Sequence, residues 1–218
     1  YSSQTTLNQT DYNPWLQFGT DGRNVTVSVV DDGVGIPGEG GYYINSLNAG
    51  QGPPRGASSG AVGHGHLNAT IIAGSADPPP PLGPDFFNYG LGVAPGANIV
   101  NIPRNRAGYT GDDQTVYDDS VSTPGPNGVH ATISNNSWGN GTNGNVYGAL
   151  EAQFDGFVRD ASLSPTVDPI TLIFSAGNSG AVGLTRPKAA KNLIAVGNSE
   201  GLRSELGGAG ANNMDDLA

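Results

Sequence analysis

The stretch that most constrains the fold of this chain is residues 24–33, a run of β-branched side chains that stops at two aspartates and a glycine. Its four valines leave little polar surface, so the run predicts a strand buried on both faces, as in a parallel sheet. Asp31 then lies at the carboxyl end of that strand, which is the edge of an open α/β sheet where ligands bind. A carboxylate at this edge needs a partner, and this predicts a functional site.

The hydrophobic pattern predicts the other elements. Four further strands are predicted by apolar runs at residues 98–102, 129–135, 170–174 and 193–196. Three helices are predicted at residues 63–74, 111–120 and 145–161, the last from apolar residues repeating at steps of three and four. Strands that alternate with helices imply right-handed crossovers. The sequence therefore predicts a three-layer α/β fold, with a mostly parallel sheet and helices on both faces.

Two details of this pattern can be checked in a structure. In the helix predicted at residues 63–74, the side chains expected on the packed face are Leu67, Ala69, Ile71 and Ala73. Residues 33–62 are dominated by glycine, proline, serine and asparagine, which predicts a long loop. Residues 1–23 are expected to form a polar amino-terminal arm, and residues 24–218 one domain.

Charge and composition exclude several classes of partner. The chain of 218 residues has 19 acidic and 9 basic side chains, a net charge of −10, which would repel nucleic acid and anionic membranes. It has no cysteine, so neither a disulfide nor a thiolate metal site can form. Since no stretch of about 18 apolar residues occurs, no membrane-spanning segment is expected. If the protein is secreted, its signal was removed before Tyr1.

Three segments carry chemically useful residues, and they follow one another along the chain. They are residues 27–33, which contain Asp31, the pair His64 and Gly65, and residues 174–180, with the sequence F-S-A-G-N-S-G. In this order the sequence resembles the subtilisin-like serine peptidases, whose Asp, His and Ser motifs occur in the same succession. Residues 92–99, 136–139 and 187–197 are similar to further segments of that family. The resemblance covers roughly residues 24–203 and implies the subtilisin-like fold.

The resemblance implies an Asp–His pair. In it, Asp31 would accept the Nδ1 proton of the His64 imidazole, and His64 would act as the general base. Taken alone, Asp31 would be interpreted as a carboxylate that caps the turn before Gly33, and the strand before it and His64 after it favour the catalytic role. Asp32 is the less favoured partner, because it occupies the variable position of the D-x-G pattern; it is interpreted as a solvated or turn-bonding side chain.

His66 competes with His64 for the role of base, because G-H-G-H departs from the H-G-T-H that is more usual in the family. Alignment on Gly63, Gly65 and the following helix favours His64, at the amino end of that helix. There the helix dipole disfavours a protonated imidazole and helps to keep the base neutral. A zinc site formed by Asp31, His64 and His66 is disfavoured, because histidines two positions apart on a helix do not converge.

The resemblance also implies an oxyanion donor and a substrate-binding segment. Asn178, after a buried strand, would donate its carboxamide to the tetrahedral oxyanion, although an asparagine beside glycine can also be a simple turn residue. Ser137, Trp138 and Gly139 would offer extended backbone to the substrate. The alternative for Trp138 is a side chain that anchors the core.

The family's nucleophile is missing. That serine lies in a Gly-Thr-Ser motif, and no Gly-Thr-Ser occurs in the chain; Ser137 and Ser179 are poor substitutes, because both lie in motifs with other roles. We therefore expect the amino-terminal portion of a peptidase domain, incomplete at its carboxyl end and inactive alone. The uncovered sheet face would then favour self-association or the binding of a carboxyl-terminal peptidase segment.

The function expected is thus that of a secreted, extracellular serine endopeptidase that hydrolyses peptide bonds in polypeptides. The alternative is a non-catalytic peptide-binding or structural remnant of the fold. No cofactor is expected to be required. A structural calcium ion stays open as an option, since carboxylate oxygens are offered by Asp112, Asp113, Asp118 and Asp119, although no segment matches an EF-hand loop.

Overall fold

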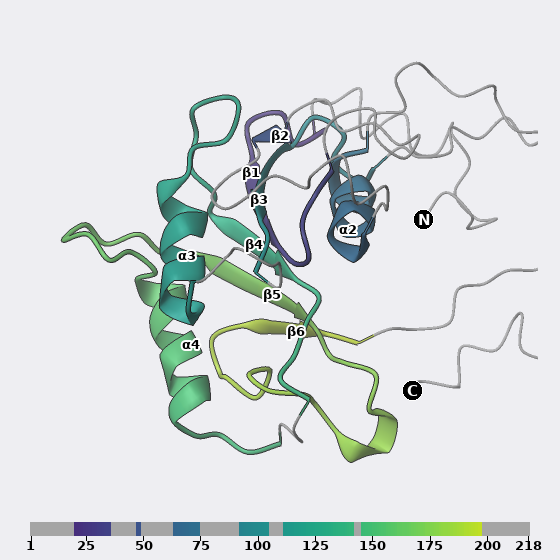
Figure 1. Cartoon of the computed structure of the whole chain (residues 1–218), viewed down its shortest axis with the longest axis vertical. Helices are drawn as coiled ribbons and strands as arrows, with labels where there is room; N and C mark the ends of the chain where they lie inside the picture. Colours follow the sequence, from purple (N-terminus) through teal and green to yellow (C-terminus); the bar gives the residue numbers. More distant parts are fainter. Residues whose placement is uncertain are drawn as a thin grey trace, which may run out of the picture.

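A parallel sheet forms the centre of the molecule. The structure, a computed structural model, describes residues 20–35, 47–48, 63–74, 92–104, 111–141 and 145–197. The sheet contains β1 (Thr26–Val30), β2 (Leu47–Asn48), β3 (Asn98–Ile102), β4 (Ile133–Asn136), β5 (Thr171–Ser175) and β6 (Ile194–Val196). Their order is β2-β3-β1-β4-β5-β6, and every neighbouring pair is parallel (Figure 1). All the strands therefore end at the same edge of the sheet.

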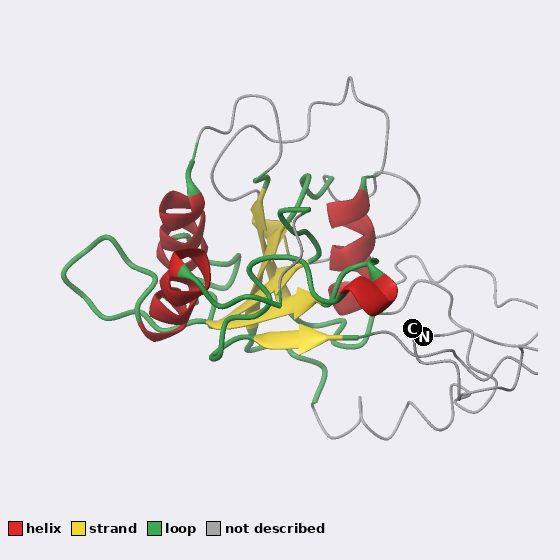
Figure 2. Ribbon diagram, turned by 90° about the horizontal axis from the view of Figure 1, so that it is seen from below, coloured by secondary structure: helices red, strands yellow, loops and turns green. Residues whose placement is uncertain are grey.

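Helices cover both faces of this sheet. Helix α2 (His64–Ala73) lies on one face, and α3 (Asp113–Ser122) and α4 (Ala149–Arg159) lie on the other (Figure 2). A short 3₁₀ turn, η3 (Gly180–Val182), follows β5. The structure thus confirms the three-layer α/β fold that the sequence predicts. None of the helices described is long and apolar enough to span a bilayer.

The two faces of the sheet pack against separate groups of buried side chains. On the side of α3 and α4 the core is rich in rings, and its members include Tyr117, Trp138, Phe154, Phe157 and Phe174. On the side of α2 the core consists of valines, alanines and Ile99. β1 belongs to both, since every residue from Thr26 to Val30 is buried, as its valine-rich sequence predicts.

The sequence-based boundaries are correct to within one residue for β3, β5 and β6, and they differ elsewhere. β4 begins at Ile133, not at residue 129, because Val129 and His130 belong to a turn in which His130 forms an isolated bridge with Pro124. β2 lies within the segment predicted to be a loop, and its two residues pair with β3. Of the predicted amino-terminal arm, residues 1–23, the first 19 lie outside the described residues.

The predicted packed face of α2 is only half correct. Ala69 and Ala73 are buried as expected, but Leu67 is 55% exposed and Ile71 is 47% exposed. The buried side of this helix is formed instead by Gly65, His66, Ala69, Thr70 and Ala73. Small side chains face the sheet because the helix lies close to it.

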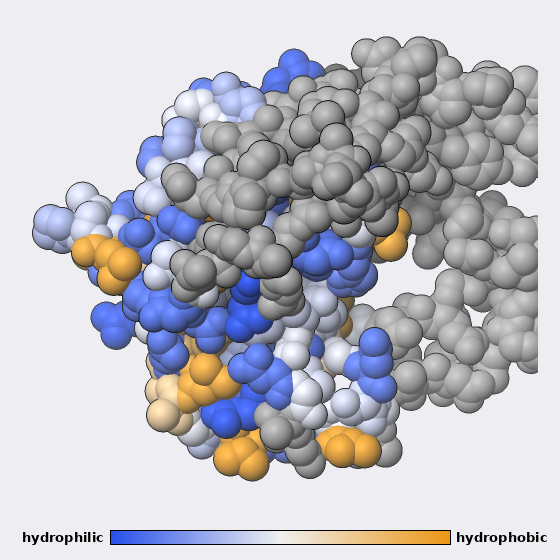
Figure 3. All heavy atoms as spheres, in the orientation of Figure 1, coloured by the Kyte–Doolittle hydropathy of each residue, from blue (hydrophilic) through white to orange (hydrophobic). Residues whose placement is uncertain are grey.

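Among the residues visible on the face in Figure 3, apolar side chains form separate spots rather than one continuous area.

Candidate active site

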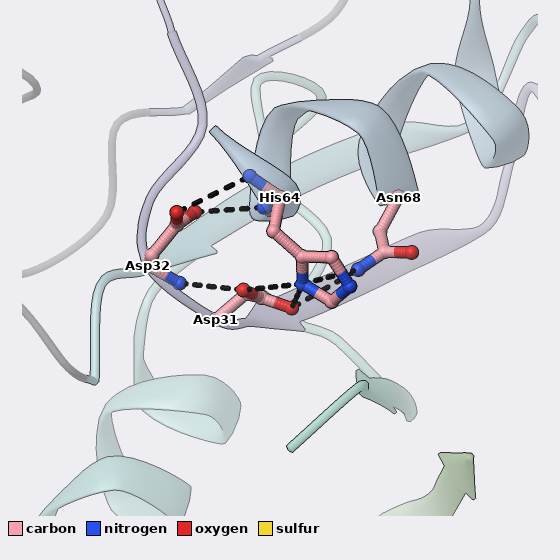
Figure 4. Close-up of polar contacts among 5 residues, drawn as sticks. Asp31, Asp32, His64 and Asn68 are labelled. Carbon is pink, nitrogen blue, oxygen red and sulfur yellow. Dashed lines mark hydrogen bonds and ion pairs between the residues drawn. The ribbon is translucent and has the colours of Figure 1, made fainter. Parts of the chain in front are cut away.

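Asp31 and His64 meet at the carboxyl edge of the sheet (Figure 4). Asp31 follows β1, and His64 is the first residue of α2. The Nδ1 atom of His64 lies 2.9 Å from each carboxylate oxygen of Asp31, whose side chain is only 6% exposed. The predicted contact between Asp31 and Nδ1 of His64 is therefore present, with His64 and not His66 as the partner.

Two further donors hold the Asp31 carboxylate. The backbone N–H of Asp32 donates to Oδ1 at 2.7 Å, and the side-chain amide of Asn68 donates to Oδ2 at 3.0 Å. Asn68 lies four residues after His64, so both side chains project from the same side of α2. Sequence reasoning missed Asn68; the spacing of His64 and Asn68 on a predicted helix is the signal that could have identified it.

Asp32 fastens α2 to the turn after β1. The residue that precedes the helix, Gly63, has no side chain with which to cap it. The Asp32 carboxylate accepts the backbone N–H of His64 at 3.2 Å and that of Gly65 at 2.7 Å, so it takes the place of an N-cap residue. The sequence suggested a solvated or turn-bonding side chain, and its role in holding the base was missed.

Gly65 allows this close approach. A Cβ atom at this position would lie 2.6 Å from the carbonyl oxygen of Gly33 and 2.9 Å from Cβ of Asp31. Any side chain at residue 65 would therefore push α2 away from the turn that carries Asp31. The glycine between the two histidines is thus required by packing.

His66 points away from the Asp31–His64 pair. Its side chain is buried, and its Nδ1 accepts the backbone N–H of Gly35 at 3.1 Å, so His66 is neutral with its proton on Nε2. His66 therefore does not share a contact with Asp31 and His64. No group of three or more His, Asp or Glu side chains in the described ranges could hold a metal ion.

The geometry determines which nitrogen of His64 can act. Because Nδ1 faces a buried carboxylate, it is the nitrogen that carries the proton, and Nε2 keeps its lone pair. The His64 side chain is 54% exposed, while Asp31 lies behind it. An imidazole held in this way can take a proton through Nε2, and the carboxylate stabilises the imidazolium that results.

The other predicted site residues follow the neighbouring strands. Ser137, Trp138 and Gly139 follow β4, and Asn178 follows β5; since β1, β4 and β5 are adjacent and parallel, these residues lie at the same edge as Asp31. Asn178 is exposed and comes after Gly177, whose φ of 106° favours glycine. Asn178 follows β5, which is two strands away from β1 in the sheet. The structure gives no hydrogen bond from Asn178 to Asp31 or His64.

The Trp138 side chain belongs to the core. It is 8% exposed and packs edge-on against Phe174 and Phe154, with ring centroids 5.1 and 6.0 Å away. The Arg104 guanidinium lies over its ring at 3.7 Å. The alternative interpretation of Trp138 as a core anchor therefore describes its side chain, and only its backbone is available for the role that the resemblance implies.

A buried hydrogen bond fixes Asn136, the residue that precedes Ser137, Trp138 and Gly139. The Tyr117 hydroxyl donates to Oδ1 of Asn136 at 2.8 Å, and burial raises the pKa of that phenol well above its usual value, so it stays protonated. The Asn136 amide donates to the carbonyl of Ser134 and, at 3.3 Å, to that of Ile173. Ser137 and Gly139 thus extend from a rigid anchor between β4 and β5.

Within the described ranges, no serine hydroxyl hydrogen-bonds to His64, whose partners are Asp31, Asp32 and Asn68. Three of the four aspartates considered for calcium make the following contacts within the chain. Asp112 caps α3 by accepting from Thr115, Asp113 pairs with Arg104, and Asp118 accepts the backbone N–H of Leu163.

Comparisons with known proteins find one matching family and two similar solved structures. The model of the subtilase family matches residues 22–216. A similar solved structure is that of MycP1 from Mycobacterium smegmatis, with 16% identity and a TM-score of 0.49, over 85% of this chain and 54% of that one. The structure of MycP1 with the N-terminal propeptide removed gives 18% identity and a TM-score of 0.40, over 78% and 48%. The chain spans about half the length of these structures. No curated protein matches it significantly.

Proposed function

Since the chain belongs to the subtilase family, we propose that it is part of a serine endopeptidase, to which it contributes the general base, the acid that orients it and the oxyanion donor. The observation that supports this most strongly is the contact of His64 Nδ1 with both oxygens of Asp31, which leaves Nε2 free to take a proton. The substrate would be a polypeptide, as it is for serine peptidases.

Each residue has one task in the proposed reaction. Nε2 of His64 removes the proton of a serine hydroxyl as that oxygen attacks the scissile carbonyl carbon, and it later delivers the proton to the leaving amine. Asp31 stabilises the imidazolium between these two steps. The carboxamide of Asn178 donates a hydrogen bond to the oxyanion that forms, and the backbone at Ser137 and Gly139 pairs with the extended substrate.

The nucleophile is proposed to come from a segment outside these 218 residues. Two observations support this: the chain has no Gly-Thr-Ser, and no described serine lies against His64. We also propose that the whole protein is secreted, that it needs no cofactor for hydrolysis, and that any calcium would be structural. Neither nucleic acid nor a membrane is proposed as a partner, because the net charge is −10.

A second candidate is a non-catalytic peptide-binding or structural remnant of the fold. The observation in its favour is again the lack of a described serine beside His64. The two candidates differ in one testable respect, because only a peptidase has a serine that reacts when His64 takes its proton.

A fluorophosphonate probe, which labels activated serines, distinguishes the candidates. We expect the product of the complete reading frame to be labelled on a serine outside residues 1–218 and the 218-residue chain to stay unlabelled. His64→Ala in the complete protein should lower kcat by about 10⁴-fold or more, and Asn178→Ala should lower it by about 10²- to 10³-fold, the loss measured for one such donor in subtilisin. A complete protein that is neither labelled nor active would favour the remnant. An adduct within residues 1–218 would contradict the placement of the nucleophile.

A further inference from the structure

Lys188 is a buried cation for which the proposed reaction has no use. Lys188 is 3% exposed, and its amine donates a hydrogen bond to the hydroxyl of Thr185. The ion pairs within the described ranges join Arg23 to Asp21, His64 to Asp31, Arg104 to Asp113 and Arg186 to Glu151. Lys188 belongs to none of them, although Arg186, two residues earlier, has a carboxylate partner.

An unpaired ammonium group is costly to bury. Burial lowers the pKa of Lys188, because desolvation disfavours its charged form. An anion beside the amine would reverse this effect and restore the charge. Within the described ranges no carboxylate pairs with this amine, so an anion brought by a ligand would suit it.

The amine lies between the two segments assigned to the substrate. A Cβ atom placed on Gly139 would be 2.9 Å from Nζ of Lys188, and one placed on Gly177 would be 3.4 Å from it. Gly139 ends the proposed substrate-binding segment, and Gly177 immediately precedes Asn178. Both glycines are exposed. The amine thus lies just beneath two exposed residues that have no side chains, and the Thr185 hydroxyl to which it donates lies closer than the amine to both of them.

The hydrogen-bonding capacity of the amine is only partly used. A lysine ammonium has three N–H donors, and the Thr185 hydroxyl accepts one. Two N–H groups are left, and the two oxygens of one carboxylate can accept hydrogen bonds from them. The strongly acidic chain would repel a polyanion, so a single carboxylate is the best match.

We propose that Lys188 determines specificity by binding the carboxylate of an aspartate or glutamate in the substrate. This rests on the proposed function, which places the scissile carbonyl at Asn178. The residue that carries this carbonyl would direct its side chain toward Gly139 and Gly177, and so toward the amine. The peptidase would then cleave after acidic residues.

The binding of two peptides to the 218-residue chain tests this directly. The peptides are acetyl-Ala-Ala-Pro-Glu-amide and acetyl-Ala-Ala-Pro-Gln-amide, which differ only in charge at the last side chain. We expect the Glu peptide to bind at least about tenfold more tightly, as one charge-assisted hydrogen bond allows. Lys188→Met should abolish the preference, whereas Lys191→Met, which removes the only other lysine, should retain it.

NMR of the lysine Cε groups gives a second readout, which does not depend on any variant. We expect the pKa of Lys188 to rise when the Glu peptide binds and to stay unchanged with the Gln peptide, while Lys191 is unaffected by both. Equal binding of the two peptides, or binding of neither, would overturn the proposal. A preference that survives Lys188→Met would do the same. None of these outcomes alters fluorophosphonate labelling, so a failure here is distinguishable from a failure of the peptidase assignment.

Discussion

The two faces of the sheet are built from side chains of very different size. Against α3 and α4, large rings interlock, with Phe154 in contact with Tyr117, Trp138, Phe157 and Phe174 at centroid distances of 5.2–6.0 Å. Against α2 the sheet meets glycine, alanine, threonine and one larger side chain, His66, while the large apolar side chains Leu67 and Ile71 face outward.

Because of this difference, one face of the sheet mainly stabilises the fold and the other mainly positions His64. Large buried rings remove much apolar surface from water, so the α3–α4 face should supply most of the hydrophobic stabilisation. Small residues bury less, but they let the start of α2 approach the turn after β1. Only at that distance can the backbone of His64 and Gly65 reach Asp32, and His64 reach Asp31. The face that contributes less to stability therefore positions the base.

The largest effect is expected on the aromatic face. Phe154→Ala should lower the free energy of unfolding by about 3–5 kcal/mol, because it leaves a cavity among four rings. The control on the other face is Leu67→Ala, which should change it by less than about 0.5 kcal/mol, because Leu67 is largely exposed. Chemical denaturation of both variants measures this. Equal losses would contradict the division between the faces.

An ion pair between a buried carboxylate and a half-buried guanidinium adds to the stability of the α4 side. Glu151 is fully buried and accepts from Nε and Nη2 of Arg186 at 2.7 and 2.6 Å, and also from the backbone N–H of Gly148. Its hydrogen bonds to Arg186, more than any other contact, lower the pKa of Glu151 from 4.5 to about 2. A lowered pKa means that the folded state favours the ionised form.

The stabilisation by Glu151 should therefore be complete above pH 4.5 and be lost as the pH falls through about 2. We expect Glu151→Gln to cost about 3 kcal/mol at pH 7, and this difference from wild type should shrink toward zero near pH 2. Unfolding measured at several pH values gives the curve. A difference that does not depend on pH would show that the charge of Glu151 is unimportant.

The smallest change in stability, with the largest consequence for the site, is expected at Gly65. In a helix, alanine is favoured over glycine by about 1 kcal/mol, but the Cβ of Gly65→Ala would meet the Gly33 carbonyl. We expect a net loss of about 1–3 kcal/mol, since α2 must shift. The control is Gly156→Ala in α4, where nothing lies within 4 Å of the new Cβ, and where stability should rise. A stabilising Gly65→Ala would show that close approach is unnecessary.

Much of the fold could be predicted because every strand except β2 has a strong local signal. Every residue of β1 and of β3 is buried, and the apolar runs in their sequences indicate this burial directly. β2 could not be predicted, because two residues in a segment rich in glycine and proline form a strand only by pairing with β3. The prediction for Leu67 and Ile71 on α2 was wrong because close packing against the sheet selects small side chains. A pattern of hydrophobic residues does not indicate such close packing.

The candidate site was predictable to a similar degree. Asp31 and His64 were identified from motifs, since the chemistry requires those residue types. Asp32 acts through hydrogen bonds that depend on how α2 docks, which no local pattern encodes. The spacing of Asn68 from His64 indicates a shared side of the helix, but its contact with Asp31 depends on the same docking. The position of Lys188 beside Gly139 and Gly177 depends on contacts between three separate segments, so it too required the structure.

The central claim is that Asp31 holds His64 with its proton on Nδ1, which leaves Nε2 as the base. Long-range ¹H–¹⁵N correlation NMR tests it directly, since the chain has only three histidines. For His64 at pH 8 we predict a protonated Nδ1 and an unprotonated Nε2, with the tautomer reversed in Asp31→Asn, where a carboxamide can donate to Nδ1. A wild-type His64 that carries its proton on Nε2 would contradict the claim.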